Sequence, residues 1–333
     1  MPTPYLYRHL AEIRAAARII SPYVYRTPMV RAHIDPRVLL KLESEQVTKS
    51  FKVRGAFAAI LRRQADLHHF DGVITASSGN HAVAVALAAR AVGVRAVALI
   101  PADADPLKIR TARDYGAEVI TAGVAFENRD QLLQAIAAER TLMQIHSYDD
   151  WDVIHGQATV AVEVLEDCPA PRAIVVPVSG GGLLAGSALT VKAIAADVQV
   201  IGVEPELAND AFRTLRTRRL QRLESSPRTI ADGARAVCIG ERNFEVIVTR
   251  GLVDDIVTVR ETDLERAIHL ASRVLELGIE PTAALPLAAY LSGQLPSGTA
   301  GRPIVLVLSG GNAGPARSKG QGLVPRTRQN TRP

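Results

Sequence analysis

The 333-residue chain has few of the features that mark secreted, metal-stabilised or membrane proteins. Its two cysteines, Cys168 and Cys238, show neither the spacing of a metal site nor a disulfide framework. No run of about 18 apolar residues occurs, so we expect no membrane-spanning helix. The first residues lack the long apolar segment of a signal peptide. These absences predict a cytoplasmic protein in a reducing compartment.

Aromatic residues are also scarce, at 4% of the chain, which limits how its positive charge can be interpreted. The net charge is +5, with five arginines between residues 213 and 222 and several more in the C-terminal tail. Basic segments can bind nucleic acid, but here no aromatic side chains are interleaved to stack on bases. We therefore expect no nucleic-acid partner, but a solvated helix face, a disordered basic tail at 315–333 and a preference for anionic small molecules.

What the chain does contain is an alternation of apolar strands and helices, long enough to bury a large core. This alternation predicts an α/β fold with parallel sheets. We expect a small domain at 72–146 and a large domain formed by 1–65 and 149–314. The predicted strands are 38–43, 72–76, 95–100, 117–121, 173–178, 199–204, 256–259 and 303–308. The predicted helices are 5–20, 56–61, 79–91, 107–115, 126–140, 151–166, 182–195, 262–276 and 281–292, with a capping box at Thr262.

A lysine, Lys52, stands between a predicted strand and a predicted helix in the segment Ser50-Phe51-Lys52-Val53-Arg54-Gly55. The positive N-terminal end of a helix and an apolar neighbourhood both disfavour a second positive charge. Such a lysine is a candidate for a lowered pKa and for Schiff-base chemistry. A lone lysine at a helix start is more often an ordinary surface group, so its role depends on the rest of the sequence.

Three glycine-bearing turns follow predicted strands, at Ser77-Ser78-Gly79-Asn80-His81, Ser179-Gly180-Gly181-Gly182-Leu183 and Ser309-Gly310-Gly311-Asn312. In parallel sheets, ligands bind beyond the carboxyl ends of the strands, so these turns could converge on one pocket. The glycines of the second turn would let backbone N–H groups surround an anion. The helix that follows adds its positive end, and a phosphate is the natural ligand.

A dinucleotide site is the competing interpretation of the second turn. Gly180 to Ala185 satisfies the loose fingerprint G-x-G-x-x-A, and Glu204 ends the next predicted strand, where a ribose-binding acid would lie. Taken alone, this segment would favour an NAD-dependent oxidoreductase. That interpretation explains neither Lys52 nor the two other serine-glycine turns.

Taken together, the motifs identify a family. The segment from Ser50 to Ala56 resembles the Schiff-base segment of fold type II pyridoxal-phosphate enzymes, in the threonine/serine dehydratase and serine racemase branch. The resemblance implies a two-domain, tryptophan synthase beta-like α/β fold with the cofactor in the cleft between parallel-sheet domains. Further matching segments, in the same order, are 26–28, 77–81, 156–157 with Glu163, 179–186, 230–233, 280–283 and 309–312.

The resemblance also implies roles for individual residues. Lys52 would bind pyridoxal phosphate covalently and later act as the base at the substrate Cα. The cofactor would further be held by Phe51, Asn80, Ser179, Gly180, Gly181, Gly182, Leu183 and Ser309. The substrate carboxylate would lie at the helix start formed by Ser77, Ser78, Gly79, Asn80 and His81.

The implied reaction is β-elimination from L-serine or L-threonine, giving a 2-oxo acid and ammonia. Ser309 at the pyridine nitrogen is neutral and does not enforce a positive ring, which favours expulsion of a β-substituent. A serine racemase is the alternative, with Lys52 and Ser78 on opposite faces of the cofactor. A β-replacement synthase is more distant. No regulatory domain is expected after Asn312, and a homodimer is the family expectation.

Two features are less settled by the resemblance. Glu204, Ala208 and Asp210 match a divalent-cation site of the racemase branch, suited to Mg²⁺ or Ca²⁺, although an exposed acidic loop would explain them equally well. Trp151 and His155 stand where smaller residues are common, and we expect them near the entrance between the domains.

Overall fold

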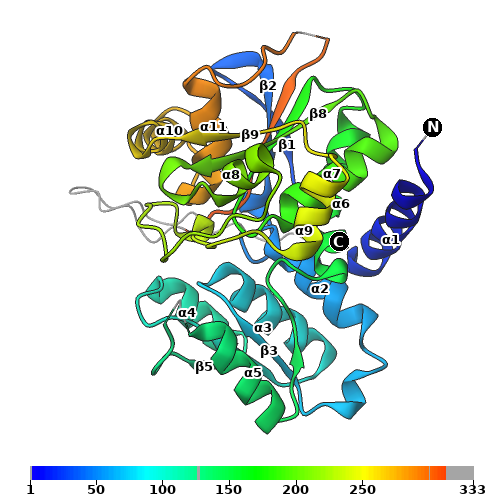
Figure 1. Cartoon of the computed structure of the whole chain (residues 1–333), viewed down its shortest axis with the longest axis vertical. Coiled ribbons are helices and arrows are strands. Elements are labelled where there is room, and N and C mark those ends of the chain that lie inside the picture. The colour runs from blue at the N-terminus through cyan, green and yellow to red at the C-terminus, as the bar shows by residue number, and fades with distance from the viewer. Residues whose placement is uncertain (1, 126–127, 300, 313–333) are drawn as a thin grey trace, which may run out of the picture.

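The computed structural model describes residues 2–125, 128–299 and 301–312 and contains two sheets. The larger has six strands in the order β1-β2-β10-β7-β8-β9, and the smaller has four in the order β5-β4-β3-β6. Figure 1 shows the two sheets as the upper and lower halves of the molecule. The predicted tail at 315–333 lies outside the described residues. No described helix combines the length and the apolar character needed to cross a membrane.

The smaller sheet is wholly parallel and lies within the predicted small domain. Its strands β3 and β4 are buried along their whole length, which is why they occur in the sequence as uninterrupted apolar runs. The strands are β3 Val73–Ala76, β4 Ala96–Leu99, β5 Glu118–Ile120 and β6 Met143–Gln144, and the helices are α3 Asn80–Val92, α4 Pro106–Asp114 and α5 Arg129–Glu139.

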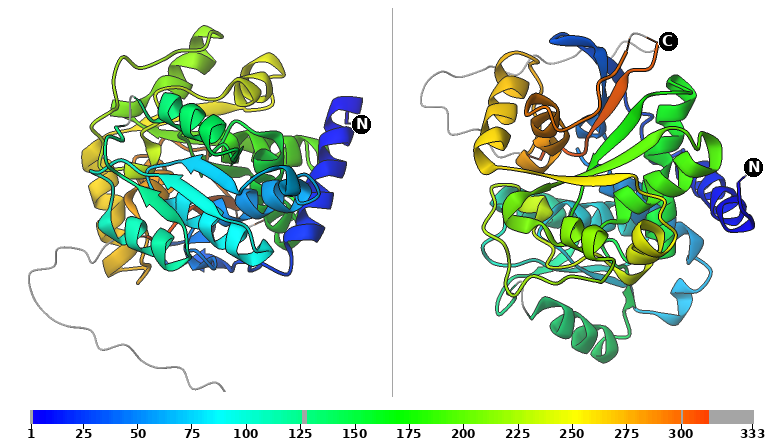
Figure 2. Two further views of the ribbon diagram at one scale, coloured as in Figure 1. Left: turned by 90° about the horizontal axis from the view of Figure 1, so that it is seen from below. Right: turned by 45° about the horizontal axis from the view of Figure 1, so that its top comes forward.

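In the larger sheet the last described strand of the chain lies in the middle. Strand β10 pairs in parallel with β2 on one side and with β7 on the other (Figure 2, right). Among the described strands, only the edge strand β1 is antiparallel. The strands are β1 Met29–Ala32, β2 Asp35–Leu42, β7 Ala173–Pro177, β8 Gln199–Pro205, β9 Asp255–Val259 and β10 Ile304–Leu308.

Helices cover both faces of the larger sheet. One apolar core joins it to α1 Pro4–Ile20, α6 Trp151–Asp167 and α7 Gly182–Ile194, and another joins it to α10 Glu261–Arg273 and α11 Leu285–Leu291. Helix α2, Lys52–Arg62, packs against α6 of the larger half and α3 of the smaller half. The start of α2 therefore lies where the two sheets meet.

A buried ion network fixes α2 in this position. The fully buried guanidinium of Arg54 donates to Glu43 at 2.8 Å and to Glu163 at 2.6 Å. Glu163 also accepts from Lys41 at 2.5 Å, so two cations face two carboxylates. Charges removed from water are tolerated when they are paired and hydrogen-bonded in this way. The network joins α2, α6 and β2, and its Arg54 lies two residues after Lys52.

Several predicted elements need correction. Helix α10 begins at Glu261 after Arg260, so Thr262 lies inside the first turn and does not cap it. The predicted helix 281–292 is divided into the 3₁₀ turn η6, Pro281–Ala284, and α11. Strand β6, the helices α8 Asp210–Thr217 and α9 Glu241–Phe244, and the π-helix η5 Glu245–Thr249 were not predicted. The exact domain boundaries stay a prediction.

Candidate active site

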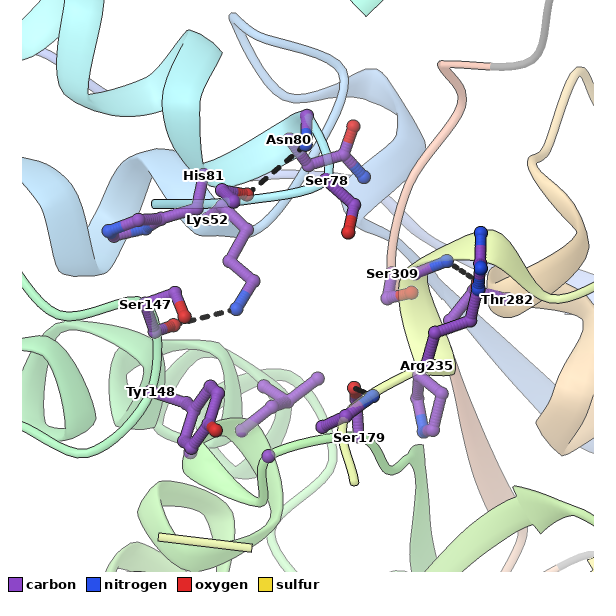
Figure 3. A pocket seen from close by; sticks show the side chains of 18 of the residues that line it. Lys52, Ser78, Asn80, His81, Ser147, Tyr148, Ser179, Arg235, Thr282 and Ser309 are labelled. Atoms are coloured by element: carbon purple, nitrogen blue, oxygen red, sulfur yellow. Dashed lines mark hydrogen bonds between the residues drawn. The ribbon is translucent and has the colours of Figure 1, made fainter. Parts of the chain in front are cut away.

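All residues predicted to hold the cofactor or the substrate line one cavity of about 100 Å³ between the two sheets (Figure 3). Phe51 and Lys52 come from the start of α2, and Ser309 follows β10. The segment 77–81 enters from the smaller sheet and 179–183 from the larger one. The carboxyl ends of strands from both sheets therefore converge on a single site.

Lys52 is a partly buried lysine at the first position of α2. Its Nζ donates to the main-chain carbonyl of Ser147 at 2.8 Å. Burial lowers the pKa of Lys52 to about 8; the charge of Glu280 raises it and that of Arg129 lowers it. The backbone N–H of Phe51 donates to the carbonyl of Ser309 at 3.1 Å, which ties this segment to the end of β10. The site thus holds an amine that loses its proton near pH 8, well below the value of 10.5 for an ordinary lysine.

The glycine loop at the start of α7 forms an anion cradle. Gly181 has φ +94°, a conformation that favours glycine, and it precedes the first residue of α7. A Cβ on Gly180 would meet the ring of Tyr148 at 2.2 Å, so only glycine fits against that side chain. The first N–H groups of a helix have no partner within it and bind anions. The loop therefore fits the phosphate of pyridoxal phosphate.

The start of α3 forms a second polar end of the cavity. The backbone N–H of Gly79 donates to Ser77 Oγ at 3.2 Å, and a Cβ on Gly79 would meet the Lys108 side chain at 2.3 Å. His81 lies against the carbonyl of Ile145 at 3.3 Å, and burial holds its pKa well below 6.5. This end offers backbone N–H groups and a neutral imidazole, which suit a substrate carboxylate.

A chain of polar contacts crosses the cavity from the smaller half to the larger one. Asn80 donates to both oxygens of Glu280, at 2.7 and 2.9 Å, and accepts from Asn312 at 3.0 Å. Lys108 contacts Asp232 at 2.6 Å and Glu280 at 3.2 Å. Burial acts to lower the pKa of Lys108, but these two carboxylates outweigh it and raise the pKa.

The sequence did not predict these partners. Asp232 and Glu280 lie in segments that carried the family resemblance, and that resemblance was the only signal that pointed to them. Lys108 lay in an ordinary amphipathic helix. Arg129, Ser147, Tyr148, Arg235 and Thr282 also line the cavity without having been singled out for the site.

The predicted cation residues lie outside this cavity. Glu204, at the end of β8, accepts the backbone N–H groups of Ala211 at 3.2 Å and Phe212 at 2.8 Å. Asp210 is buried, and its Oδ2 has no partner in the described residues. Burial raises the pKa of Glu204 and, to about 7, that of Asp210. The exposed-loop interpretation is therefore wrong, while the cation site stays a prediction.

The donor set at this place fits a hard divalent cation. An unpartnered buried carboxylate beside a second one is costly unless a proton or a cation compensates the charge. The third ligand would be the backbone carbonyl of Ala208, in the 3₁₀ turn η3, Glu206–Ala208. No group of three or more His, Cys, Asp or Glu side chains suited to a metal occurs in the described residues, so water would complete the shell.

Comparisons with known proteins agree with this geometry. The family model described as "Pyridoxal-phosphate dependent enzyme" matches residues 20–310. The chain is 37% identical over 306 residues to the L-threo-3-hydroxyaspartate ammonia-lyase of Saccharomyces cerevisiae, covering 90% of this chain and 92% of the relative. It is 37% identical over 311 residues to the serine racemase of Arabidopsis thaliana, covering 91% and 92%.

Solved structures show the same fold. A threonine deaminase from T.th. superposes with a TM-score of 0.85 at 42% identity, covering 92% of this chain and 99% of that one. Maize serine racemase superposes with a TM-score of 0.85 at 36% identity, covering 92% and 94%. The chain is a fold type II enzyme that depends on pyridoxal phosphate. It belongs to the family whose members include threonine dehydratases, hydroxyaspartate ammonia-lyases and serine racemases.

Proposed function

We propose that the chain is an ammonia-lyase that eliminates water from L-serine or L-threonine and releases a 2-oxo acid and ammonia. The observation that carries this proposal is the placement of the Lys52 amine and the Gly180–Gly182 cradle in one cavity. When bound, pyridoxal phosphate supplies the aldehyde that binds amino acids and the electron sink for their breakdown.

The residues of the cavity divide the remaining tasks. The glycine loop binds the phosphate group, and Asn80 and Ser309 orient the ring from two other sides. The start of α3 binds the substrate carboxylate, with neutral His81 adding no second positive charge. Lys52 removes the proton from the substrate Cα, for which a pKa of about 8 suits an enzyme working near neutral pH.

Ser309 supports elimination as the principal outcome. It presents a hydroxyl group, where an aspartate would force a proton onto the ring nitrogen. Weaker electron withdrawal at that nitrogen favours prompt loss of the β-hydroxyl group from the substrate. The test is 2-oxo acid release from L-serine and L-threonine by purified protein, followed by borohydride trapping and peptide mass analysis. A cofactor adduct on a residue other than Lys52 would overturn the assignment of the base.

Racemisation of serine is the second candidate, favoured by the position of Ser78 in the same cavity as Lys52. A hydroxyl group on the other face of the substrate could return a proton to Cα with inversion. Ser78→Ala should then abolish formation of D-serine and spare elimination from L-serine. Equal loss of both activities would contradict a separate role for Ser78.

A substrate with a second carboxylate is favoured by Arg235, on the side of the cavity opposite Lys52 (Figure 3). Its Nε is buried and has no partner in the described residues, and Nη1 lies 3.8 Å from the exposed Asp103. Relatives from yeast and from Pseudomonas act on L-threo-3-hydroxyaspartate. Arg235→Gln should lower kcat/KM for hydroxyaspartate at least about tenfold more than for L-serine. Equal losses for both substrates would exclude a side-chain contact, and Arg242→Gln is the exposed control.

The cation and the oligomeric state complete the proposal. A divalent cation at Glu204, Ala208 and Asp210 should raise the melting temperature, and Glu204→Gln should remove that response. A homodimer is expected from the family, and light scattering measures it directly. Neither outcome bears on the chemistry assigned to Lys52.

A further inference from the structure

A pair of buried histidines joins helix α1 to helix α6, away from the active-site cavity. His9 Nδ1 lies 2.9 Å from His155 Nε2, which is a hydrogen-bond distance, and both side chains are buried. Trp151, one turn before His155, lies 4.6 Å from the His9 ring, centre to centre. Trp151 and His155, expected from the sequence near the entrance between the domains, do not line the cavity.

The outer nitrogens of the pair have no partners. His9 Nε2 and His155 Nδ1 are buried and accept or donate no hydrogen bond in the described residues. The rings of Tyr5 and His9 lie 4.4 Å apart, centre to centre, and the guanidinium carbon of Arg250 lies 4.1 Å from the centre of the Tyr5 ring. A buried pair of imidazoles whose outer nitrogens have no partner is stable only while both rings remain uncharged.

We propose that the His9–His155 pair is a proton-sensitive latch that holds α1 on α6 when both imidazoles are neutral and releases it when they are protonated. One imidazole donates the bridging proton and the other accepts it. A first additional proton must enter a buried nitrogen that has no acceptor. A second additional proton would leave both His9 Nδ1 and His155 Nε2 protonated, so two N–H groups would face each other across 2.9 Å and repel.

The surroundings do not compensate these charges. Arg8 and Glu12 on α1, Arg62 on α2, and Glu245 and Arg250 near η5 are the charged groups that face the pair. Burial, followed by Arg8, lowers the pKa of His9 from 6.5 to about 4. Burial, followed by His9 and Arg62, lowers the pKa of His155 to about 3. The released state therefore binds more protons below pH 6.5, and docking weakens as the pH falls from there.

The latch is connected to the segment that holds Lys52. Glu12 of α1 binds Arg62 at the end of α2 at 2.5 Å, and Arg62 approaches Asp152 of α6 at 3.4 Å. The next residue, Arg63, forms an ion pair with Asp150. Asp150 caps the start of α6 and follows Ser147 and Tyr148 closely in the sequence. Release of α1 removes the first member of this ion chain, so the position of the Ser147 carbonyl depends on the latch.

The test uses the holoenzyme between about pH 7 and pH 5. Each histidine should weaken α1 docking roughly 20-fold over this range, because the released imidazole titrates near 6.5 and the docked one does not. Hydrogen exchange, corrected for its intrinsic pH dependence, should therefore rise in α1 before it rises in the large sheet. Trp151 is the only tryptophan of the chain, so its emission should change over the same range.

The double variant His9→Leu with His155→Leu should keep α1 protected at pH 5 and leave Trp151 emission unchanged. His269→Gln, at an exposed position on α10, is the control and should behave as the original protein. Protection of α1 in the original protein that is unchanged at pH 5 would overturn the proposal, even if the double variant does not fold. An acid response that the folded double variant retains would overturn it as well.

Discussion

The two walls of the cavity each contribute a lysine, and the pKa values of the two are shifted in opposite directions. Lys52, from the large half, has a main-chain carbonyl as its hydrogen-bond partner, and burial lowers its pKa to about 8. Lys108, from the small half, touches Glu280 and Asp232, which raise its pKa against the effect of burial. Burial therefore lowers the pKa of an amine, and so makes it more reactive, only where no carboxylate is in contact with the amine.

Removing the amine of Lys52 should have the largest effect. Lys52→Ala should lower 2-oxo acid formation at least about 10³-fold, because the other lysine that lines the cavity, Lys108, is held in its charged form by two carboxylates. Initial rates with saturating cofactor measure this loss. Lys49→Asn is the control, since Lys49 is exposed and has φ 53°, which asparagine tolerates. A Lys52→Ala protein with substantial activity would refute the assignment.

The second prediction concerns the paired member. Lys108→Met leaves Glu280 buried without its cation, so the free energy of unfolding should fall by roughly 3–5 kcal/mol. Combining it with Glu280→Gln should recover more than half of that loss, and urea unfolding measures both. Lys192→Met, which breaks the more exposed contact with Asp254, should cost only about 1 kcal/mol. Similar losses of unfolding free energy in the Lys108 and Lys192 variants would show that burial does not make the Lys108 ion pair more costly to break.

The third prediction tests the lowered pKa of Lys52 through the pH dependence of cofactor capture. Only the neutral amine attacks an aldehyde, so the capture rate of cofactor-free protein should rise about tenfold per pH unit and level off near pH 8. Glu280→Gln removes a charge that raises the pKa of Lys52, so the break should move to lower pH. Stopped-flow absorbance follows the reaction. A break near pH 10.5 would mean that burial does not perturb this lysine.

The smallest expected effect concerns the loop that follows β7. Ser179 Oγ accepts the backbone N–H of Ala236 at 3.3 Å, so Ser179→Ala should lower the free energy of unfolding by about 1 kcal/mol. Ser187→Ala in α7 is the control, because its buried hydroxyl has no partner among the described residues. Thermal unfolding of both variants decides whether this bond stabilises the wall around the phosphate cradle.

The sequence predicted those parts of the site that a short segment defines by itself. Lys52 and the glycine turn at 180–182 are recognisable because strand, turn and helix follow each other directly, and the cavity contains both. The Lys108–Glu280 contact could not be predicted, because it joins two segments far apart in the chain. The Thr262 cap failed because Arg260 begins the turn and contacts Asp263 at 2.8 Å instead.

The same limit applies to the histidine pair. Trp151 and His155 stood out as unusually large residues, but their partner His9 lies on a helix whose packing no local pattern reveals. Likewise, the alternation of elements indicated parallel sheets, but the central position of β10 arises only when the whole sheet is assembled.

The central place of β10 has a consequence during synthesis of the protein. Ser50 forms a β-bridge with Gly310, and the N–H of Phe51 donates to Ser309. The segment that carries Lys52 is synthesised early, but it is held in place by residues synthesised near the end. A nascent chain still attached to the ribosome therefore lacks a finished cofactor pocket until β10 emerges. Premature termination before residue 304 should yield a chain that cannot retain pyridoxal phosphate, however well its smaller half folds.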